Sequence, residues 1–573
     1  MTTKIFNHIS AFQPRQFLSP DADLSCSIVV EQYGRLLIYR RVDSSSEFEQ
    51  WILDCSEYAA GLDQTESLLN IAMTCQTDDP AKAAAYTKFI ETVAPVHDKI
   101  NDQLDQRFLE LWQKFPLEEQ RYAVYLRGTR EDRALFRDKN IPLFTKIDLL
   151  TQEYQTISAA MTVPFEGREQ TLPEVSKYLL EPDRLLREKA WRALTERRLA
   201  ERRRLDDLFD RMLALRQTAA ANAGCRDFIE YQFRHYHRFD YSPADCAQFH
   251  AAVANVILPL WKEILQRRKL QMGLAQLRPW DLSADPLGRP ALKPFTSSEE
   301  LILGCEKIFQ KIDPLFGRQF SAMAEKGLLD LLSRKGKAPG GYQSTLQEAR
   351  QPFIFMNSVG VDTDVRTLLH EGGHAFHALA CVAEPLVSYR RAPMEFSEVA
   401  SMAMELLGGE FLGVFYSSDE KRRSVTDHLE DVVYTLVWVA VIDAFQHWIY
   451  SHPGHSHAER DQIWVEIYDR FGGELVDWTG LKPAKSALWH KQLHIFEVPF
   501  YYIEYGIAQL GALQVWENYQ KDHRRAVADY QRALRLGGAK PLPELFKTAG
   551  LEFDFSQKRM EEWIGPARAA LEL

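Results

Sequence analysis

Cysteine is scarce in this sequence and is not arranged in pairs. The 573 residues include seven cysteines, an odd number, spread along the chain without any C-x-x-C spacing. A disulfide framework or a thiolate zinc site would need paired or closely spaced cysteines. The sequence therefore argues against both and indicates a reducing compartment.

Blocks of basic residues and long apolar runs are also missing. Lys and Arg are scattered, the formal net charge is −11 and the pI is about 5.9, so no basic face for nucleic acid is expected. The N-terminus contains no apolar core of signal-peptide length. The best candidate for a membrane span, residues 436–450, is interrupted by Asp443, Gln446 and His447. We expect a soluble, cytoplasmic protein that binds neither nucleic acid nor membrane.

The residues that are abundant predict a mainly α fold. A hydrophobic content of 46% over 573 residues allows a large core, and the chain is too long for one simple domain. Strand signals are few, with a hairpin expected around Gly167 and a short strand at residues 352–357. The prolines that interrupt the helices after this hairpin predict a boundary between an N-terminal helical region, 1–165, and a larger region, 166–573. Apolar residues recur at helical spacing in three long stretches: 80–115, 183–222 and 243–270.

The strongest local pattern is H-E-x-x-H, which begins at His370. Residues four apart lie on the same face of an α-helix, so His370 and His374 can bind one metal ion. Glu371 lies about 100° round the helix, where it can take a proton from a metal-activated water without binding the metal. The adjacent Gly372 and Gly373 weaken the helix by roughly 1 kcal/mol each, a cost that often marks a place of close approach. The pattern predicts zinc, with Glu371 as the general base.

The third ligand must come from elsewhere in the chain. The metzincin continuation is absent, because His377 and Ala380 stand where that pattern has its Gly and its third His. A following amphipathic helix, predicted over 393–409, offers three carboxylates: Glu395, Glu398 and Glu405.

These three carboxylates suit different roles. Glu398 lies 24 residues after His374 (398 − 374), in an apolar stretch where an unpaired carboxylate is costly, so it is the candidate ligand. Glu395 is a candidate cap at the start of the helix. Glu405 lies two turns beyond Glu398 on the same face, where it can orient a ligating histidine.

These residues and the segments around them resemble the thimet oligopeptidase and oligoendopeptidase F family of metallopeptidases, on the oligoendopeptidase side. The resemblance implies a large, gluzincin-like helical fold with a deep substrate channel, one zinc ion per chain, and cleavage of internal bonds in oligopeptides. It supports Glu398 as the ligand that completes the set with His370 and His374. The family has Phe where this chain has Gly372, which alters packing beside the metal but removes no ligand. The matching stretches are residues 161–180, 278–282, 338–344, 352–379, 389–407 and 494–516.

The segment that begins at His494 supplies candidates for stabilising the oxyanion of peptide hydrolysis. Tyr502 and Tyr505 are three residues apart, so they point the same way on a helix. The family pattern has a His and two such Tyr at the active site, which implies catalytic roles for His494, Tyr502 and Tyr505. The spacing from His494 differs by about one residue from the thimet-type pattern, so Tyr501 is a rival.

Two other functions fit part of the pattern. A zinc carboxypeptidase or dipeptidyl carboxypeptidase would share the zinc chemistry but needs a carboxylate clamp, for which Arg390 and Arg391 are weak candidates. A non-enzymatic peptide-binding protein with structural zinc would usually have four protein ligands, whereas three are found here. We expect oligopeptide substrates, with residues 352–357 as an edge strand that pairs with them. The sequence does not give the oligomeric state.

Overall fold

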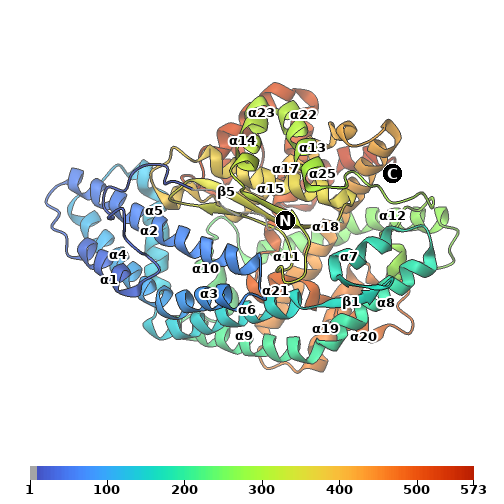
Figure 1. Ribbon diagram of the computed structural model, residues 1–573, viewed down its shortest axis with the longest axis horizontal. Helices are drawn as coiled ribbons and strands as arrows, with labels where there is room; N and C mark the ends of the chain where they lie inside the picture. The colour runs from blue at the N-terminus through green and yellow to red at the C-terminus, as the bar shows by residue number, and fades with distance from the viewer. Residues whose placement is uncertain (1–8) are drawn as a thin grey trace.

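The computed structural model describes residues 9–573 and is mainly helical, with two small sheets (Figure 1). This confirms the expected fold class. Among the described residues before 166, strand β1 Thr162–Phe165 is preceded by six α-helices: α1 Ser27–Ile38, α2 Ser45–Thr74, α3 Pro80–Thr92, α4 Ala94–Lys114, α5 Glu119–Leu135 and α6 Ile141–Ala159.

The helices α1–α5 form one end of the molecule, drawn in blue in Figure 1. They have a core of their own, which includes Phe48, Trp51 and Phe108. The following helix, α6, packs instead into the main core through Leu150 and Tyr154. The domain boundary near residue 165 stays a prediction, and the first eight residues of the predicted N-terminal region lie outside the described residues.

The predicted hairpin is confirmed. Strands β1 Thr162–Phe165 and β2 Arg168–Thr171 pair antiparallel around a turn at Glu166 and Gly167. Both turn residues have positive φ, 47° and 80°, a backbone conformation that suits glycine. The chain then continues through six helices: α7 Leu172–Ser176, α8 Arg184–Ala200, α9 Arg202–Ala223, α10 Phe228–His235, α11 Pro243–Ala252 and α12 Leu258–Gln271.

The strand expected at 352–357 is present, but its position in the sheet differs from the expectation. Strand β5 Gln351–Ser358 is the central strand, paired parallel with β3 Leu329–Leu332 and antiparallel with β4 Tyr342–Leu346. Both neighbours use its backbone groups, so it is not an edge strand. Strand β4 is the edge strand that contacts helix α15 Asp362–Ala380. The helices α13 Ser298–Ile312 and α14 Pro314–Glu325 precede this sheet.

The helices that carry the predicted site residues follow the sheet, and α15 and α17 Met394–Gly409 lie near the middle of Figure 1. Helix α15 starts directly after β5 and packs against α17, and α17 packs in turn against α22 Ile503–Lys521. The remaining helices are α16 Val387–Arg390, α18 Ser418–Ser451, α19 His457–Arg470, α20 Lys482–Ser486, α21 Leu493–Glu497, α23 His523–Leu534, α24 Leu542–Thr548 and α25 Gln557–Ala570.

Helix α18 is the only helix among residues 9–573 that is long and apolar enough to cross a membrane. Of its most apolar window, 72% is buried inside the protein. Its apolar character is therefore that of a core helix, and it packs against α22 Ile503–Lys521.

Candidate active site

Helix α15 positions the H-E-x-x-H residues, and its start is fixed by one carboxylate. Asp364 accepts hydrogen bonds from the backbone N–H groups of Val359, Gly360 and Val361, at 2.8, 2.8 and 2.9 Å. These N–H groups precede the helix, so the carboxylate both caps α15 and holds the turn that connects it to β5.

The paired glycines bring α15 against neighbouring helices, where the sequence had indicated close approach of substrate or a strand. A Cβ atom added to Gly373 would lie 2.5 Å from the backbone of Ala400 and Ser401 on α17. Only a residue without a side chain allows this approach. The two helices that carry the candidate metal ligands are therefore in backbone contact at this point.

His370, His374 and Glu398 converge on one point, with their ligand atoms all within 4.8 Å of one another. Glu398 Oε2 lies 3.3 Å from His370 Nε2 and 3.5 Å from His374 Nε2. Two imidazoles and one carboxylate form the donor set of catalytic zinc sites that leave a position for water. Glu398 is 2% exposed, so a cation at this point would compensate its buried charge. The residues present therefore fit a zinc ion.

Two further residues hold the ligand His370 in place. The Glu405 carboxylate accepts from His370 Nδ1 at 2.7 Å and lies 3.1 Å from His428 Nε2. With its Nδ1 proton held by Glu405, His370 presents the lone pair of Nε2 to the ligand point. Glu405 thus has the orienting position expected from the sequence.

Glu371 is buried beside the ligand point, and its Oε2 atom has no hydrogen-bond partner among the described residues. Burial raises the pKa of its carboxyl group. Its other oxygen faces the loop before β4, where a Cβ added to Gly341 would lie 3.4 Å away. An unpartnered carboxylate oxygen next to three metal-type donors is suited to accept a proton from water.

His377 lies one turn beyond His374 but is not part of the ligand cluster. It is 5% exposed and its ring lies 6.0 Å from that of Phe396. Burial, with a smaller effect of His374, lowers the pKa of His377 to about 3, so it is a neutral side chain. Glu395, the third carboxylate of α17, accepts a hydrogen bond from the Tyr241 hydroxyl at 2.7 Å and is likewise separate from the cluster.

A chain of hydrogen bonds leads from the core to Tyr505. Trp438 Nε1 donates to Gln492 Oε1 at 3.0 Å, and an indole nitrogen can only donate. The Gln492 amide nitrogen therefore faces His494 Nδ1, 2.7 Å away, and His494 Nε2 carries the proton that points to the Tyr505 hydroxyl at 3.0 Å. Burial lowers the pKa of His494 to about 4 and raises that of Tyr505, so both are neutral near pH 7. The Tyr505 hydroxyl hydrogen remains free for another acceptor.

The three tyrosines of this segment have different surroundings. Tyr501 donates its hydroxyl to Glu398 Oε1 at 2.7 Å and so touches a candidate ligand. Tyr502 packs its ring on His494 at 5.0 Å, while its hydroxyl lies beside Trp438 and Gln492. The negative charges of Glu398 and Glu371 contribute to the raised pKa of Tyr505, so its hydroxyl lies near both carboxylates.

Comparison with known proteins identifies the family. A sequence profile of peptidase family M3 matches residues 178–563, more than half of the chain. The chain belongs to peptidase family M3. Oligopeptidase PepF of Bacillus subtilis is 25% identical over 308 residues, which are 52% of this chain and 44% of that protein. The chain spans about half the length of the curated relatives it matches.

Solved structures extend the likeness to almost the whole M3 chain. A structure assigned provisionally to oligoendopeptidase F has a TM-score of 0.90 and 26% identity, and the match covers 97% of this chain and 98% of that one. PZ peptidase A, solved with an inhibitor, has a TM-score of 0.89 and 25% identity, with 95% and 96% covered. The resemblance to the oligoendopeptidase side, seen in the sequence, is confirmed.

The departure from the family pattern at Gly372 has a packing explanation. A Cβ added to Gly372 would lie 2.5 Å from Cζ of Phe309, a side chain of α13. Phe309 stacks edge-on against Phe376 at 4.8 Å and fills the space beside the metal helix. The Phe309 ring of α13 thus occupies the space into which a side chain at position 372 would extend.

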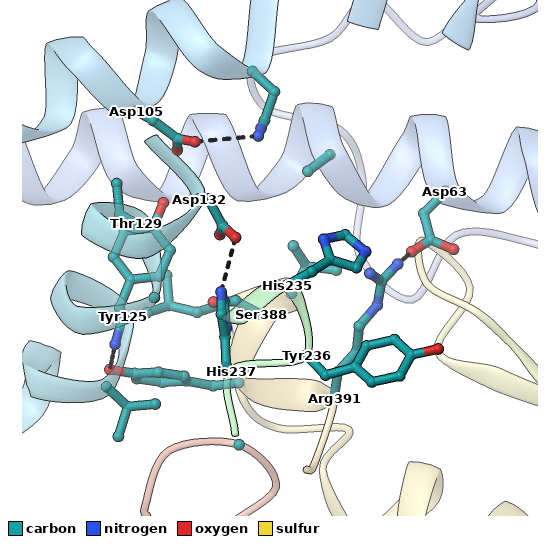
Figure 2. A pocket seen from close by; sticks show the side chains of 18 of the residues that line it. Asp63, Asp105, Tyr125, Thr129, Asp132, His235, Tyr236, His237, Ser388 and Arg391 are labelled. Atoms are coloured by element: carbon teal, nitrogen blue, oxygen red, sulfur yellow. Dashed lines mark hydrogen bonds and ion pairs between the residues drawn. The ribbon is translucent and has the colours of Figure 1, made fainter. Parts of the chain in front are cut away.

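A cavity of about 1150 Å³ lies between the N-terminal helices and the catalytic half of this M3 chain. Its lining includes side chains of α2–α6 on one side and the segments 235–241 and 386–395 on the other. Figure 2 shows Arg391 reaching Asp63 and His237 reaching Asp132 between these two sides. Met394 and Glu395 of α17 line the cavity, whereas the candidate ligands His370, His374 and Glu398 do not.

Sequence reasoning missed two residues at this site. His428 lies on α18, 23 residues beyond Glu405, and Gln492 lies two residues before His494. His428 stands in a charge-rich stretch of α18, residues 418–431, and Gln492 stands next to Lys491, so the sequence marks neither residue as buried.

Proposed function

We propose that this chain is a zinc-dependent oligoendopeptidase that hydrolyses internal peptide bonds of oligopeptides. The observation that carries the proposal is the unpartnered Glu371 oxygen next to the converging donors of His370, His374 and Glu398. These three residues would hold one zinc ion per chain. When bound, zinc supplies a Lewis acid that polarises the substrate carbonyl and lowers the pKa of water.

Glu371 then acts as the general base. Its raised pKa reflects burial, which makes the carboxylate a stronger proton acceptor than one in water. The proton it takes from water can pass to the leaving amine. Helix α15 holds Glu371 beside the proposed ligands, and Glu371 does not itself bind the metal.

Tyr505 is the proposed donor to the oxyanion that forms on the scissile carbonyl. His494 donates to the oxygen of Tyr505, so the Tyr505 hydrogen is directed away from His494 and toward a second acceptor. Tyr501 is the second candidate, because its hydroxyl already lies at Glu398. The role expected for Tyr502 stays a prediction, and its hydroxyl position beside Trp438 favours support of Gln492 and His494.

Internal cleavage is favoured over removal of C-terminal residues. A carboxypeptidase needs a free cation for the substrate carboxylate, and Arg390 donates to Gln347 and to the backbone carbonyls of Glu384 and Pro385. Arg391 forms an ion pair with Asp63. Neither arginine is therefore available as a clamp.

We further propose a cytoplasmic location. All seven cysteines are free thiols, and six of them are buried, which fits a reducing compartment.

Digestion of a mixed peptide library with product identification by mass spectrometry tests this function. Internal cuts without stepwise trimming are expected, and sequential loss of terminal residues would contradict the proposal. The matched control is Glu371→Gln, which keeps the ligands. We expect this variant to bind zinc normally and to lose most turnover, because water has no proton acceptor. Near-normal turnover in zinc-replete Glu371→Gln would refute the assigned general base.

A further inference from the structure

A second group of metal-type donors lies outside the active site, between α11 and α18. Cys246 and His250 are one helical turn apart on α11, and Asp443 and His447 are one turn apart on α18. Each pair therefore presents both side chains from one face of its helix. Cys246, His250 and Asp443 are buried, with exposed fractions of 1%, 7% and 0%.

The donor atoms of this group are close enough to share one ion. The ligand atoms of Cys246, Asp443 and His447 all lie within 4.8 Å of one another, and His447 Nε2 is 3.3 Å from Asp443 Oδ2. A tetrahedral zinc shell, with bonds of about 2.0–2.3 Å, separates its ligand atoms by about 3.3–3.8 Å. A small inward shift of these side chains would bring their ligand atoms to the separations of a zinc shell.

The buried carboxylate at the centre of the group is incompletely satisfied. Asp443 Oδ1 has no hydrogen-bond partner among the described residues, and His447 Nε2 has none either. The described ion-pair partners of Asp443 are two histidines, His250 at 2.8 Å and His447 at 3.3 Å. The nearby cation Arg238 is engaged by Glu504. A fully buried carboxylate with an unpartnered oxygen is costly unless a cation completes its shell.

We propose that Cys246, Asp443 and His447 bind a divalent transition-metal ion of the zinc class, separate from the active-site ion. Thiolate, carboxylate and imidazole together suit zinc or cobalt and do not suit calcium or magnesium. His250 remains hydrogen-bonded to Asp443 and orients it. The absence of C-x-x-C does not exclude this site, because its donors come as C-x-x-x-H and D-x-x-x-H pairs on two helices.

The position of the group assigns it a structural task. The His447 ring packs 5.2 Å from that of Phe500, and Gln446 accepts from the Phe500 backbone N–H at 2.8 Å. Phe500 has a positive φ of 66°, an unfavourable conformation for a side chain of this size, and it directly precedes Tyr501. An ion here fastens α11 to α18 behind the turn that presents Tyr501 to Glu398.

Cobalt substitution of the full-length protein tests this site. After removal of bound metal and reconstitution with Co²⁺, we expect two ions per chain and a thiolate-to-cobalt charge-transfer absorption. That absorption reports the second site alone, because the active-site donors contain no sulfur. Cys246→Ala should bind one ion and lose the absorption. The matched control is Cys305→Ala, a buried helical cysteine away from these donors, which should keep both.

The outcomes also separate this site from the active site. Glu398→Ala should lose one ion and keep the absorption, whatever the fate of the proposed peptidase activity. One ion per chain without thiolate absorption in the wild-type protein would overturn the proposal, and that result does not depend on a variant that folds. An absorption that survives in both Cys246→Ala and His447→Ala would overturn it as well.

Discussion

Glu398 is held by a neighbouring side chain at each of its oxygens. Ser401 donates to Oε2 at 3.0 Å, and Tyr501 donates to Oε1 at 2.7 Å. The two imidazoles approach Oε2 from the side of α15. The protein therefore holds both oxygens of this carboxylate in place, which lowers the entropy cost of binding a cation there.

Loss of a residue that hydrogen-bonds to a metal ligand typically weakens metal binding by about 10–100-fold. Replacing Glu398 with Gln should weaken zinc binding by more than this. The reason is that an amide carries no charge and is a poor ligand. Zinc content after dialysis against a competing chelator measures the effect. Glu395→Gln is the control, because Glu395 is equally buried on the same helix but bonds to Tyr241. If the Glu398→Gln variant kept one zinc ion per chain, the third ligand would have to be another residue.

The tyrosine cluster gives a second prediction at the scale of single residues. Tyr505→Phe should lower kcat by about 10²–10³, with a smaller change in KM, because the lost hydroxyl acts mainly in the transition state. Steady-state kinetics of the three variants Tyr501→Phe, Tyr502→Phe and Tyr505→Phe rank the candidates. If Tyr505→Phe changes kcat less than tenfold while Tyr501→Phe exceeds that, the oxyanion role belongs to Tyr501.

At the scale of helices, the contact between α15 and α17 sets the metal site. Gly373→Ala should place a methyl group 2.5 Å from the α17 backbone, which cannot rotate away. Overpacking of this kind typically costs about 1–3 kcal/mol, more than the roughly 1 kcal/mol that alanine gains in helix propensity. We expect a lower melting temperature and weaker zinc binding.

Gly372→Ala is the matched comparison for that variant. Its methyl group would meet the Phe309 ring, a side chain that can tilt. Thermal unfolding of both variants should therefore show a larger loss for Gly373→Ala. Equal losses would mean that the backbone contact with α17 does not control the site.

The helices that carry the site could be predicted from the sequence because each contains its own pattern. The four-residue spacing of His370 and His374 predicts that they share one face of a helix, and Glu398 is a carboxylate within an apolar helix. The place of β5 in its sheet could not be predicted, because it depends on β3, four residues whose Leu-Asp-Leu-Leu sequence lacks alternation. His428 and Gln492 were missed because their partners lie on other elements, and such pairings are fixed only by tertiary packing.

At the scale of the whole molecule, the N-terminal helices are tied to the catalytic half at several points around the cavity. Thr74 of α2 bonds to Tyr342 of β4 at 2.6 Å, and Arg121 of α5 pairs with Glu384 at 2.9 Å. The Tyr389 hydroxyl donates to the Arg121 carbonyl at 2.8 Å. These contacts join the same two parts of the chain between which the cavity of about 1150 Å³ lies.

A narrow channel between the two halves, which the family resemblance implies, would give an enclosed approach and predicts that substrate length limits cleavage. An extended oligopeptide can lie between the two halves, whereas a folded protein, or a long chain that must thread through, meets the N-terminal helices. Activity should fall steeply beyond a few tens of residues, even for unfolded chains. The measurement compares one scissile sequence placed in a short peptide, in a long disordered chain and in a folded protein. Equal rates for the short and the long unfolded substrates would contradict the enclosed approach and would leave the zinc chemistry unaffected.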